Sequence, residues 1–318
     1  MNVMTDASTS SGVIALSRPM RELLAIGQRL AEARSAVLVQ GESGTGKDLL
    51  AHWIHYKGAR RDGPFIKIHC PSIPEDLLES ELFGHEKGAF TDARQAKAGK
   101  IELAAGGTLY FDQIQDLAPP LQAKLLRVVE ERRFERLGGT RTIDVDVRFV
   151  SSSNGELAQA VAKGTFRDDL YHRLSVVPLT LPPLRDRRED VQPLAEHFLL
   201  RERERKTTAA LGFDDDAAAA LKGYQWPGNV RELRSVVERA ALYVQGDRVT
   251  CASLPPHIIE RPSTLWEGRD RRPTLREVEQ SYLRFVLEQV GGSQTRAAAI
   301  LGISRKALWE KRRRYGIP

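Results

Sequence analysis

The sequence predicts an α/β fold: a parallel sheet with helices on both faces, followed by a helical unit and a small all-α helix-turn-helix domain. Short apolar runs alternate with helical patterns over residues 18–182, which is typical of strand–helix–strand units. The pattern over residues 183–259 is helical and rich in alanine, with few strand signals. Residues 274–318 show short helical segments separated by glycine turns.

The individual elements follow from the spacing of apolar residues. Apolar runs predict strands at residues 36–39, 64–70, 108–111, 145–152 and 176–179. Helical spacing predicts helices at residues 19–33, 75–83 and 121–131, and one after the first strand that includes Leu50 and Ile54. Residues 1–17 are small and polar, so we expect a flexible tail there. Residues 260–273 are polar, basic and contain prolines, which indicates a linker.

The composition limits the class of protein. A chain of 318 residues is long enough for two or three domains with buried cores. Its two cysteines, Cys70 and Cys251, indicate neither a disulfide framework nor a zinc site, and they favour a reducing compartment. No signal peptide or membrane-spanning run is found. We therefore expect a cytoplasmic protein that does not associate with membranes.

The first strand leads into a glycine-rich turn with the spacing of a P-loop. Its residues are Gly41, Glu42, Ser43, Gly44, Thr45, Gly46 and Lys47. Glycines let successive N–H groups point into one concavity that accepts phosphate oxygens, and the following helix N-terminus adds positive charge. Lys47 can reach the outer phosphates. Asp48 stands where Ser or Thr usually contacts Mg²⁺. The alternative, an ordinary glycine-rich turn, does not explain the full spacing.

A second acidic residue completes the expected nucleotide site. Asp112 ends the apolar strand at residues 108–111, and a P-loop ATPase needs a carboxylate at the end of a neighbouring strand to hold Mg²⁺. An apolar strand that ends in one acid is common, so this signal has weight only beside the P-loop. The expected cofactors are ATP and Mg²⁺.

These motifs belong to an ordered set that resembles the AAA+ activators of sigma-54 RNA polymerase, the bacterial enhancer-binding proteins. The matching segments are GESGTGK (41–47), ESELFGHEKGAFT (79–91), GGTL (106–109), FRDDLY (166–171), LPPLRDR (181–187) and WPGNVREL (226–233). The resemblance extends from about residue 14 to the end of the chain. It implies an AAA+ α/β ATPase subdomain at 18–182 and an AAA+ helical lid at 183–259.

The resemblance also implies roles for single residues. Lys47 would bind the phosphates, Asp112 would hold Mg²⁺, Asn154 resembles the sensor I residue, and Arg231 resembles sensor II. Arg167 and Arg173 resemble arginine fingers that enter the neighbouring subunit's site, which implies a hexameric ring of identical or different subunits. Phe90 and Thr91 lie in the segment that resembles the loop contacting sigma-54. For any single arginine, a surface ion pair is the alternative.

The chain departs from the family pattern at three positions. Gln113 follows Asp112 where the family has glutamate, His69 replaces an asparagine that contacts this glutamate, and Asp92 replaces a glycine in the sigma-54 loop. An amide cannot accept a proton from the attacking water. One hypothesis is that the site binds ATP but hydrolyses it inefficiently. In the other, His69 and Gln113 position the water and His69 takes the proton. We favour slow turnover.

The C-terminal segment predicts DNA binding. The chain carries a net charge of +6, and residues 311–314 form a basic cluster. Ser304 suits the N-cap of a last helix after the turn at Gly302, which gives helix-turn-helix spacing and resembles the Fis-type domain of the same family. Expected base contacts are Ser304, Arg305, Lys306 and Trp309, and expected phosphate contacts are Lys311, Arg312 and Arg313. For Trp309, a place in the core is equally compatible with the sequence.

Together these patterns indicate a sigma-54-dependent activator. It would bind an upstream activating site on DNA and use ATP in a ring to remodel sigma-54 RNA polymerase. Because only a short tail precedes the ATPase, we expect control by a trans-acting regulator, by abundance or by partner subunits. The alternative is an ATP-binding, hydrolysis-deficient DNA-binding regulator that acts as a partner or antagonist of an active activator.

Overall fold

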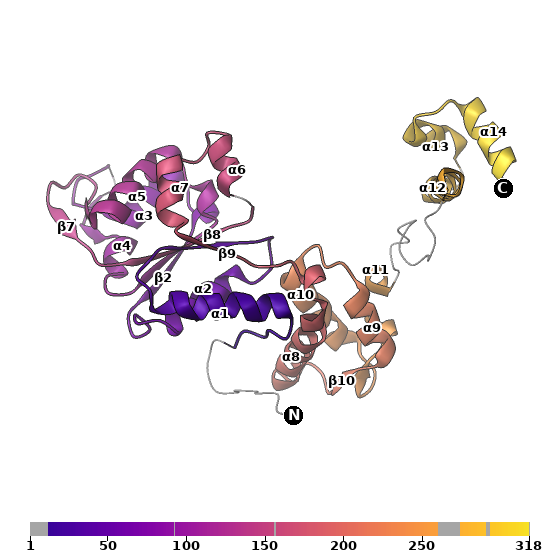
Figure 1. Cartoon of the computed structure of the whole chain (residues 1–318), viewed down its shortest axis with the longest axis horizontal. Coiled ribbons are helices and arrows are strands. Elements are labelled where there is room, and N and C mark those ends of the chain that lie inside the picture. Colours follow the sequence, from indigo (N-terminus) through magenta and orange to yellow (C-terminus); the bar gives the residue numbers. More distant parts are fainter. Residues whose placement is uncertain (1–11, 92, 156, 260–273, 291–292, 318) are drawn as a thin grey trace. The chain divides into compact units, whose positions relative to one another are not determined.

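The computed structural model describes residues 12–91, 93–155, 157–259, 274–290 and 293–317. Contacts between residues divide the chain into two units, Met1–Pro255 and Pro256–Pro318. The first unit contains the sheet and the helical lid, and the second contains the helices of the C-terminal segment (Figure 1). Each unit is described by itself.

The centre of the first unit is a five-stranded parallel sheet with the order β2-β5-β8-β1-β9. Its strands are β1 (Val37–Gln40), β2 (Phe65–His69), β5 (Thr108–Asp112), β8 (Arg148–Ser153) and β9 (Val177–Thr180). Strands β1, β5 and β8 are almost wholly buried, as expected for a sheet covered on both faces. The residues of β1 and β5 are mostly apolar, whereas β8 ends in three buried serines. The carboxyl ends of all five strands therefore meet at one edge.

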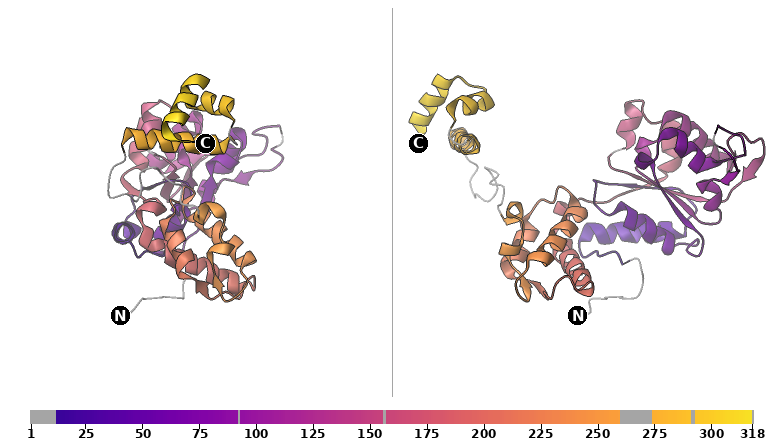
Figure 2. Two further views of the ribbon diagram at one scale, coloured as in Figure 1. Left: turned by 90° about the vertical axis from the view of Figure 1, so that its right-hand side faces the viewer. Right: turned by 180° about the vertical axis from the view of Figure 1, so that it is seen from behind.

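Helices cover both faces of this sheet (Figures 1 and 2). One face carries α1 (Arg18–Glu32) and α2 (Lys47–Tyr56), whose Leu23, Leu50 and Ile54 are buried against it. The other carries α3 (Glu75–Phe83), α4 (Lys100–Leu103), α5 (Pro119–Glu131), α6 (Leu157–Ala162) and α7 (Asp168–Leu174). Their apolar residues form a second core with the sheet. The predicted α/β fold is confirmed.

Two small hairpins beside the sheet were not predicted. They pair β3 (Gly84–His85) with β4 (Lys97–Ala98), and β6 (Arg133–Glu135) with β7 (Thr142–Asp144). Backbone hydrogen bonds between residues 84–86 and Leu137 join the two hairpins. The Arg136 guanidinium adds ion pairs to Glu86 and Glu102. Strands of two or three residues are too short for a periodic signal, which is why the sequence did not reveal them.

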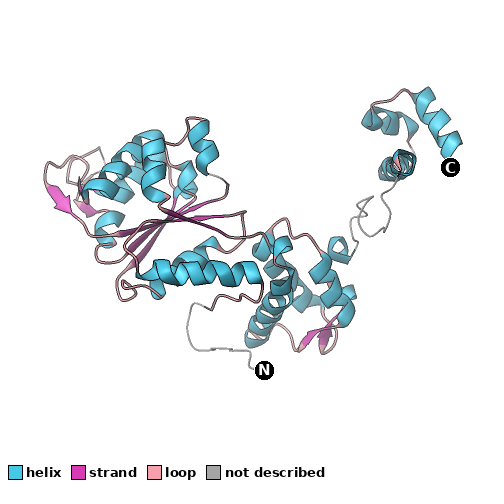
Figure 3. Cartoon of the chain, viewed as in Figure 1, coloured by secondary structure: helices cyan, strands magenta, loops and turns pink. Residues whose placement is uncertain are grey.

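The helical lid follows the sheet along the chain (Figure 3). It contains α8 (Val191–Glu204), α9 (Asp215–Gly223), α10 (Asn229–Tyr243) and a short pair of strands, β10 (Gly212–Phe213) and β11 (Arg248–Val249). Trp226 is fully buried, and its indole N–H donates to the carbonyl of Leu221 over 2.9 Å. The short helix α11 (Pro256–Ile259) comes after the end of this unit. Short 3₁₀ turns of the described residues follow β2 and β5, at Cys70–Ser72 and Ile114–Asp116, and flank the lid helices, at Leu184–Asp186, Arg188–Asp190 and Cys251–Ser253.

The lid also holds the segment that precedes α1. The fully buried carboxylate of Asp190 accepts hydrogen bonds from the backbone N–H groups of Leu16 and Ser17, and from the Ser17 hydroxyl, over 2.6–2.7 Å. The flexible tail predicted for residues 1–17 is therefore too long, since these two residues are fixed. The signal was missed because the partner lies 173 positions away in the sequence.

The second unit is a bundle of α12 (Leu275–Gln289), α13 (Gln294–Leu301) and α14 (Arg305–Tyr315). Its core includes Leu283, Val286, Ala297 and Leu308. Ser304 is the predicted N-cap, and its hydroxyl accepts from the Ala307 N–H over 3.1 Å. The turn before it contains Gly302 with φ of 64°, a conformation that favours glycine. Gly291 and Gly292, whose place in the sequence predicts the end of the helix that begins near residue 274, lie outside the described residues.

We predict that Asp190→Ala lowers the free energy of unfolding by at least about 2 kcal/mol, because buried donors that lose a charged acceptor carry that cost. The buried Arg187 would also lose its nearby negative charge. Denaturant unfolding of the purified chain measures the change. The matched control is Asp62→Ala, since Asp62 is 92% exposed. Equal stability of the two variants would contradict this role of Asp190.

Candidate functional site

The P-loop joins β1 to α2 in a backbone conformation that its glycines make accessible. Gly44 has φ of 79° and Gly46 has φ of 106°, both in the left-handed region. A Cβ on Gly44 would also lie 2.3 Å from the carbonyl oxygen of Gly228 in the lid. The Thr45 hydroxyl donates to the carbonyl of Glu42 over 2.9 Å and closes the turn. Lys47 begins α2, so the positive end of that helix points into the turn.

The Lys47 ammonium is the buried cation of the turn. Its Nζ donates to the carbonyl oxygens of Gly41 and Glu42 over 2.8 and 2.9 Å, and to Oδ1 of Asn154 over 2.7 Å. The side chain is 7% exposed, and burial lowers its pKa. Asn154 follows β8, the neighbour of β1 in the sheet. Two residues that lie 107 positions apart thus meet, as expected if both contact the outer phosphates of a nucleotide.

The lid contacts the P-loop through Glu42 and Ser43. The Glu42 carboxylate accepts two hydrogen bonds from Arg185, over 2.5 and 2.9 Å, and one from the amide of Asn229 over 3.2 Å. The hydrogen bond from Arg185 lowers the pKa of Glu42. The Glu42 side chain therefore binds the lid, and only its backbone remains for phosphate. Arg231 at the start of α10 donates to the Ser43 hydroxyl over 2.8 Å.

Asp112 ends β5 in a polar network. Its Oδ1 accepts from the Ser152 hydroxyl over 2.9 Å, and its Oδ2 contacts the His69 ring over 2.9 Å. The Lys67 ammonium lies 3.0 Å from the same Oδ2. Burial opposes ionisation of Asp112, yet hydrogen bonds led by the one from Lys67 hold its pKa below the usual value. The carboxylate is therefore ionised at neutral pH.

Asp48, the second residue of α2, belongs to the same network. Its Oδ1 accepts from the Tyr110 hydroxyl over 2.7 Å, and its Oδ2 pairs with the Lys67 ammonium. Lys67 thus bridges Asp48 and Asp112. A pair of carboxylates around one cation is the hard oxygen donor set that Mg²⁺ prefers, so these residues fit the metal that the sequence predicts.

Gln113 adopts a strained backbone conformation directly after Asp112. Its φ of 59° and ψ of 58° lie in the left-handed region, which is uncommon outside glycine. Its N–H donates to the Ser152 hydroxyl over 3.1 Å. The sequence hypothesis paired His69 with Gln113. In the part of the chain that the structure describes, the His69 ring instead bonds to Asp112. Local strain of this kind accumulates at functional sites.

The two candidate arginine fingers lie on the surface. Arg167 pairs with Asp169 over 2.7 Å and is 47% exposed in its side chain. Arg173 pairs with Glu130 over 2.8 Å and is 60% exposed. Both partners belong to the same chain and to exposed positions, where ion pairs are weak and easily exchanged. The two guanidinium groups therefore lie at the surface in weak ion pairs with residues of their own chain.

The candidate sigma-54 loop rests on the first hairpin. Phe90 is 43% exposed, and its ring meets the His85 ring edge-on with centroids 4.9 Å apart. The Gly88 N–H donates to the Ala93 carbonyl over 2.8 Å and closes the loop. Thr91 is exposed, and Asp92 lies outside the described residues. A half-exposed aromatic ring on a short loop is suited to a protein contact.

The C-terminal unit places most of the predicted DNA contacts on the outside. Ser304, Arg305 and Lys306 are exposed at the start of α14. Trp309 is 51% exposed, so it is not a core residue, and the Arg313 guanidinium lies 5.7 Å from its ring centroid. Arg312 is half-buried.

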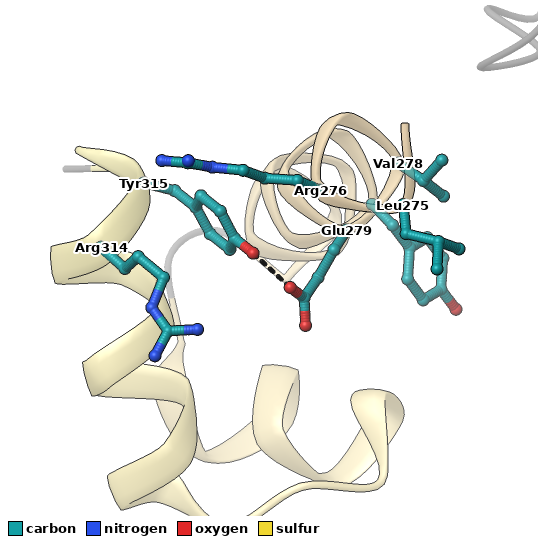
Figure 4. A pocket seen from close by; sticks show the side chains of 7 residues that line it. Leu275, Arg276, Val278, Glu279, Arg314 and Tyr315 are labelled. Carbon is teal, nitrogen blue, oxygen red and sulfur yellow. Dashed lines mark hydrogen bonds between the residues drawn. The ribbon is translucent and has the colours of Figure 1, made fainter. Parts of the chain in front are cut away.

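Lys311 differs from the expectation of a free phosphate contact, because its ammonium pairs with Glu279 of α12. The Tyr315 hydroxyl donates to the same carboxylate (Figure 4). Glu279 and Tyr315 border a hollow between α12 and α14, lined also by Leu275, Arg276, Val278, Tyr282 and Arg314. Lys311 therefore helps to join two helices of the bundle.

Several residues of the site were missed by sequence reasoning. They are Lys67, Tyr110 and Ser152 at the sheet edge, and Arg185 and Asn229 at the lid. Arg185 and Asn229 lie within motifs that had been noticed, so their polar character was an available signal. Lys67 and Tyr110 alternate with His69 and Asp112 along their strands, and alternate residues share one face of a sheet.

Comparison with known proteins agrees with this geometry. Residues 13–180 match the Sigma-54 interaction domain, residues 185–269 the AAA+ ATPase lid domain, and residues 274–315 the Fis family of bacterial regulatory proteins. No helix in the described ranges is long and apolar enough to cross a membrane.

Relatives align with nearly the whole chain. Regulatory protein AtoC of Escherichia coli is 45% identical over 312 residues, which cover 96% of this chain and 68% of AtoC. The Nif-specific regulatory protein of Herbaspirillum seropedicae is 43% identical, covering 96% of this chain and 62% of that protein. The crystal structure of NtrX from Brucella abortus in complex with ATP is 35% identical, with a TM-score of 0.72 over 96% of this chain and 70% of NtrX. The chain belongs to the sigma-54 interaction domain family, with an AAA+ lid and a Fis-type helix-turn-helix domain.

Proposed function

We propose that this chain is an ATP-dependent activator of sigma-54 RNA polymerase that binds an upstream DNA site. The observation that carries the proposal is the meeting of the Lys47 ammonium, the Asn154 amide and the lid residue Arg231 around one glycine-rich turn. These groups come from α2, the end of β8 and α10, so a triphosphate bound there would contact both the sheet and the lid. Binding or hydrolysis of the nucleotide would therefore act on the lid as well as on the sheet.

ATP and Mg²⁺ are the proposed cofactors. The backbone N–H groups of residues 41–47 would cradle the phosphates, and Lys47 would exchange its carbonyl partners for outer phosphate oxygens. Asp112 and Asp48 would hold Mg²⁺, which when bound neutralises negative charge on the phosphates. The solved relative from Brucella abortus, a complex with ATP, supports the nucleotide.

Assembly into a ring is proposed from the two surface arginines. Arg167 and Arg173 would leave their exposed carboxylate partners and enter the site of a neighbouring subunit, where a guanidinium stabilises the transferring phosphoryl group. Sites completed in trans require a head-to-tail arrangement, and we propose a hexamer of identical or different subunits.

Phe90 and Thr91 are the proposed contact residues for sigma-54. Their loop is joined to the second hairpin through Glu86, Leu137 and Arg136. A change at the sheet edge could therefore move both hairpins as one piece, and the exposed Phe90 ring would be presented to the polymerase. The basic start of α14 would anchor the ring at its DNA site.

A Lys47→Ala variant tests the whole proposal. We expect its affinity for ATP to fall by at least about tenfold, because a buried charge-assisted contact to phosphate is lost. Sigma-54-dependent open-complex formation in a purified transcription system should disappear with it. The conservative variant Lys47→Arg reports whether charge alone is enough. A Lys47→Ala protein that still opens the promoter as well as the parent would refute the proposed ATP-dependent mechanism.

Gln113 is proposed to slow hydrolysis. We predict that Gln113→Glu raises the ATP turnover number by about tenfold to a hundredfold, because a carboxylate can accept the proton of the attacking water. Steady-state phosphate release by the purified chain measures it. Gln28→Glu, at an exposed position of α1, is the control and should leave the turnover number unchanged. If the parent already turns over rapidly and the variant gains nothing, then Gln113 does not limit the reaction.

Lys306 is proposed as a contact of the DNA-binding helix. We expect Lys306→Ala to weaken binding to the upstream site by about 1–3 kcal/mol and to weaken binding to random DNA much less, as for the loss of one base contact. An equal loss on both DNAs, with the slope of affinity against salt lowered by about one unit, would contradict the base contact and assign Lys306 to a phosphate. Lys222 is an exposed lysine of the lid, and Lys222→Ala should change neither the affinity for the upstream site nor the salt slope.

A further inference from the structure

One lysine occupies an unexpected place at the edge of the sheet. Lys67 is the central residue of β2, and its ammonium lies 3.0 Å from Oδ2 of Asp112 while it also pairs with Oδ2 of Asp48. The two carboxylates are the ones that the proposed function assigns to Mg²⁺. A single ammonium therefore sits where the metal would have to be bound.

We propose that Lys67 is a built-in counter-ion of the metal site, so that Mg²⁺ binds by displacing the Lys67 ammonium from Asp48 and Asp112. The inference rests on the proposed binding of Mg²⁺ and ATP and adds a specific residue that sets the metal dependence. In the absence of metal, Lys67 also supplies positive charge to a bound triphosphate.

The carboxylates need a cation at this position. Asp112 is only 13% exposed in its side chain, and Asp48 lies close enough to share one ammonium with it. Two like charges held this close repel each other unless a cation lies between them. Burial lowers the pKa of Lys67, but the two carboxylates outweigh that effect and raise it, so the ammonium stays charged.

The remaining contacts keep the two carboxylates in place when the ammonium leaves. Tyr110 holds Oδ1 of Asp48 over 2.7 Å, and Ser152 holds Oδ1 of Asp112 over 2.9 Å. Neither hydroxyl depends on Lys67. The two Oδ2 atoms that would face a metal are thus held in place, with Lys67 as the exchangeable member. Oδ2 of Asp112 also keeps its contact with the His69 ring over 2.9 Å.

Lys67 itself is able to move. Its side chain is 35% exposed, and a lysine carries its charge on a flexible four-carbon stem. The ammonium also lies 5.6 Å from the centroid of the Tyr110 ring, a favourable contact that holds it near the site without closing it. A divalent cation at millimolar concentration could therefore replace it at modest cost.

The experiment compares Lys67→Met with the parent by titrating MgCl₂ into the full chain with a fixed concentration of fluorescently labelled ATP. We expect the Mg²⁺ concentration at half-maximal binding to fall by about tenfold, the factor for one modest charged contact. In EDTA the same variant should bind the nucleotide more weakly than the parent, because two uncompensated carboxylates then face the phosphates. A lower Mg²⁺ midpoint together with weaker nucleotide binding in EDTA is the result expected for an exchangeable counter-ion.

Three controls separate this role from a structural one. Tyr110→Phe removes a hydrogen bond to Asp48 without removing charge, and it should not lower the Mg²⁺ midpoint. Lys67→Arg keeps the charge and should leave nucleotide binding in EDTA within about twofold of the parent. Lys124→Met breaks an exposed lysine–glutamate pair elsewhere and should change neither curve.

The outcomes are distinct. A Lys67→Met midpoint equal to the parent's, or weaker binding by this variant both in EDTA and in Mg²⁺, overturns the counter-ion role. If Lys67→Met is too unstable to measure, Lys67→Gln is titrated in its place, and the same two results decide. A parent that binds no labelled ATP at any Mg²⁺ concentration refutes the proposed function itself.

Discussion

The structure depends on one constraint: the five central strands are all parallel, so their carboxyl ends open on the same edge of the sheet. Gln40, His69, Asp112 and Ser153 all terminate strands there. The register pairs His69 with Asp112 and Val39 with Ser152. Residues from distant parts of the sequence are thus placed side by side before any side-chain interaction is formed. The residues of the sheet that form the candidate nucleotide site lie at this edge, and the lid residues contact it through the P-loop.

Two ammonium groups organise the charges at that edge in different ways. Lys47 is buried and bonded mainly to neutral oxygens, so burial is the leading influence on its pKa. Lys67 lies between two carboxylates, and their attraction exceeds the effect of burial. The first arrangement leaves positive charge unneutralised for an anion. The second neutralises negative charge that a metal would otherwise neutralise.

The lid is connected to this edge at two separate places. Glu42 of the P-loop binds Arg185 and Asn229, and the amide of Asn229 also contacts the backbone of Ser43. Asp190 fixes the chain just before α1, which packs on the sheet. Because a carboxylate with several donors is costly to leave unpaired, both connections hold the lid against the P-loop and the start of α1.

The sequence by itself was sufficient for the α/β class, the P-loop with Lys47, the acid at Asp112 and the capped last helix at Ser304. These features are local: strand and helix periods, glycine spacing and a capping residue act over a few positions. Gln113 could likewise be singled out as a residue that cannot accept a proton, although its left-handed backbone could not be foreseen.

Only the tertiary structure decided which side chains meet. It paired His69 with Asp112 instead of Gln113, placed Lys67 between two carboxylates, and joined Lys311 to Glu279. Strand order and register determine the contacts at the sheet edge, and helix packing determines the pair of Lys311 with Glu279. Neither is written in the period of a single element. Pairings between residues tens of positions apart result from burying two faces of one sheet at once, which is a property of the folded chain as a whole.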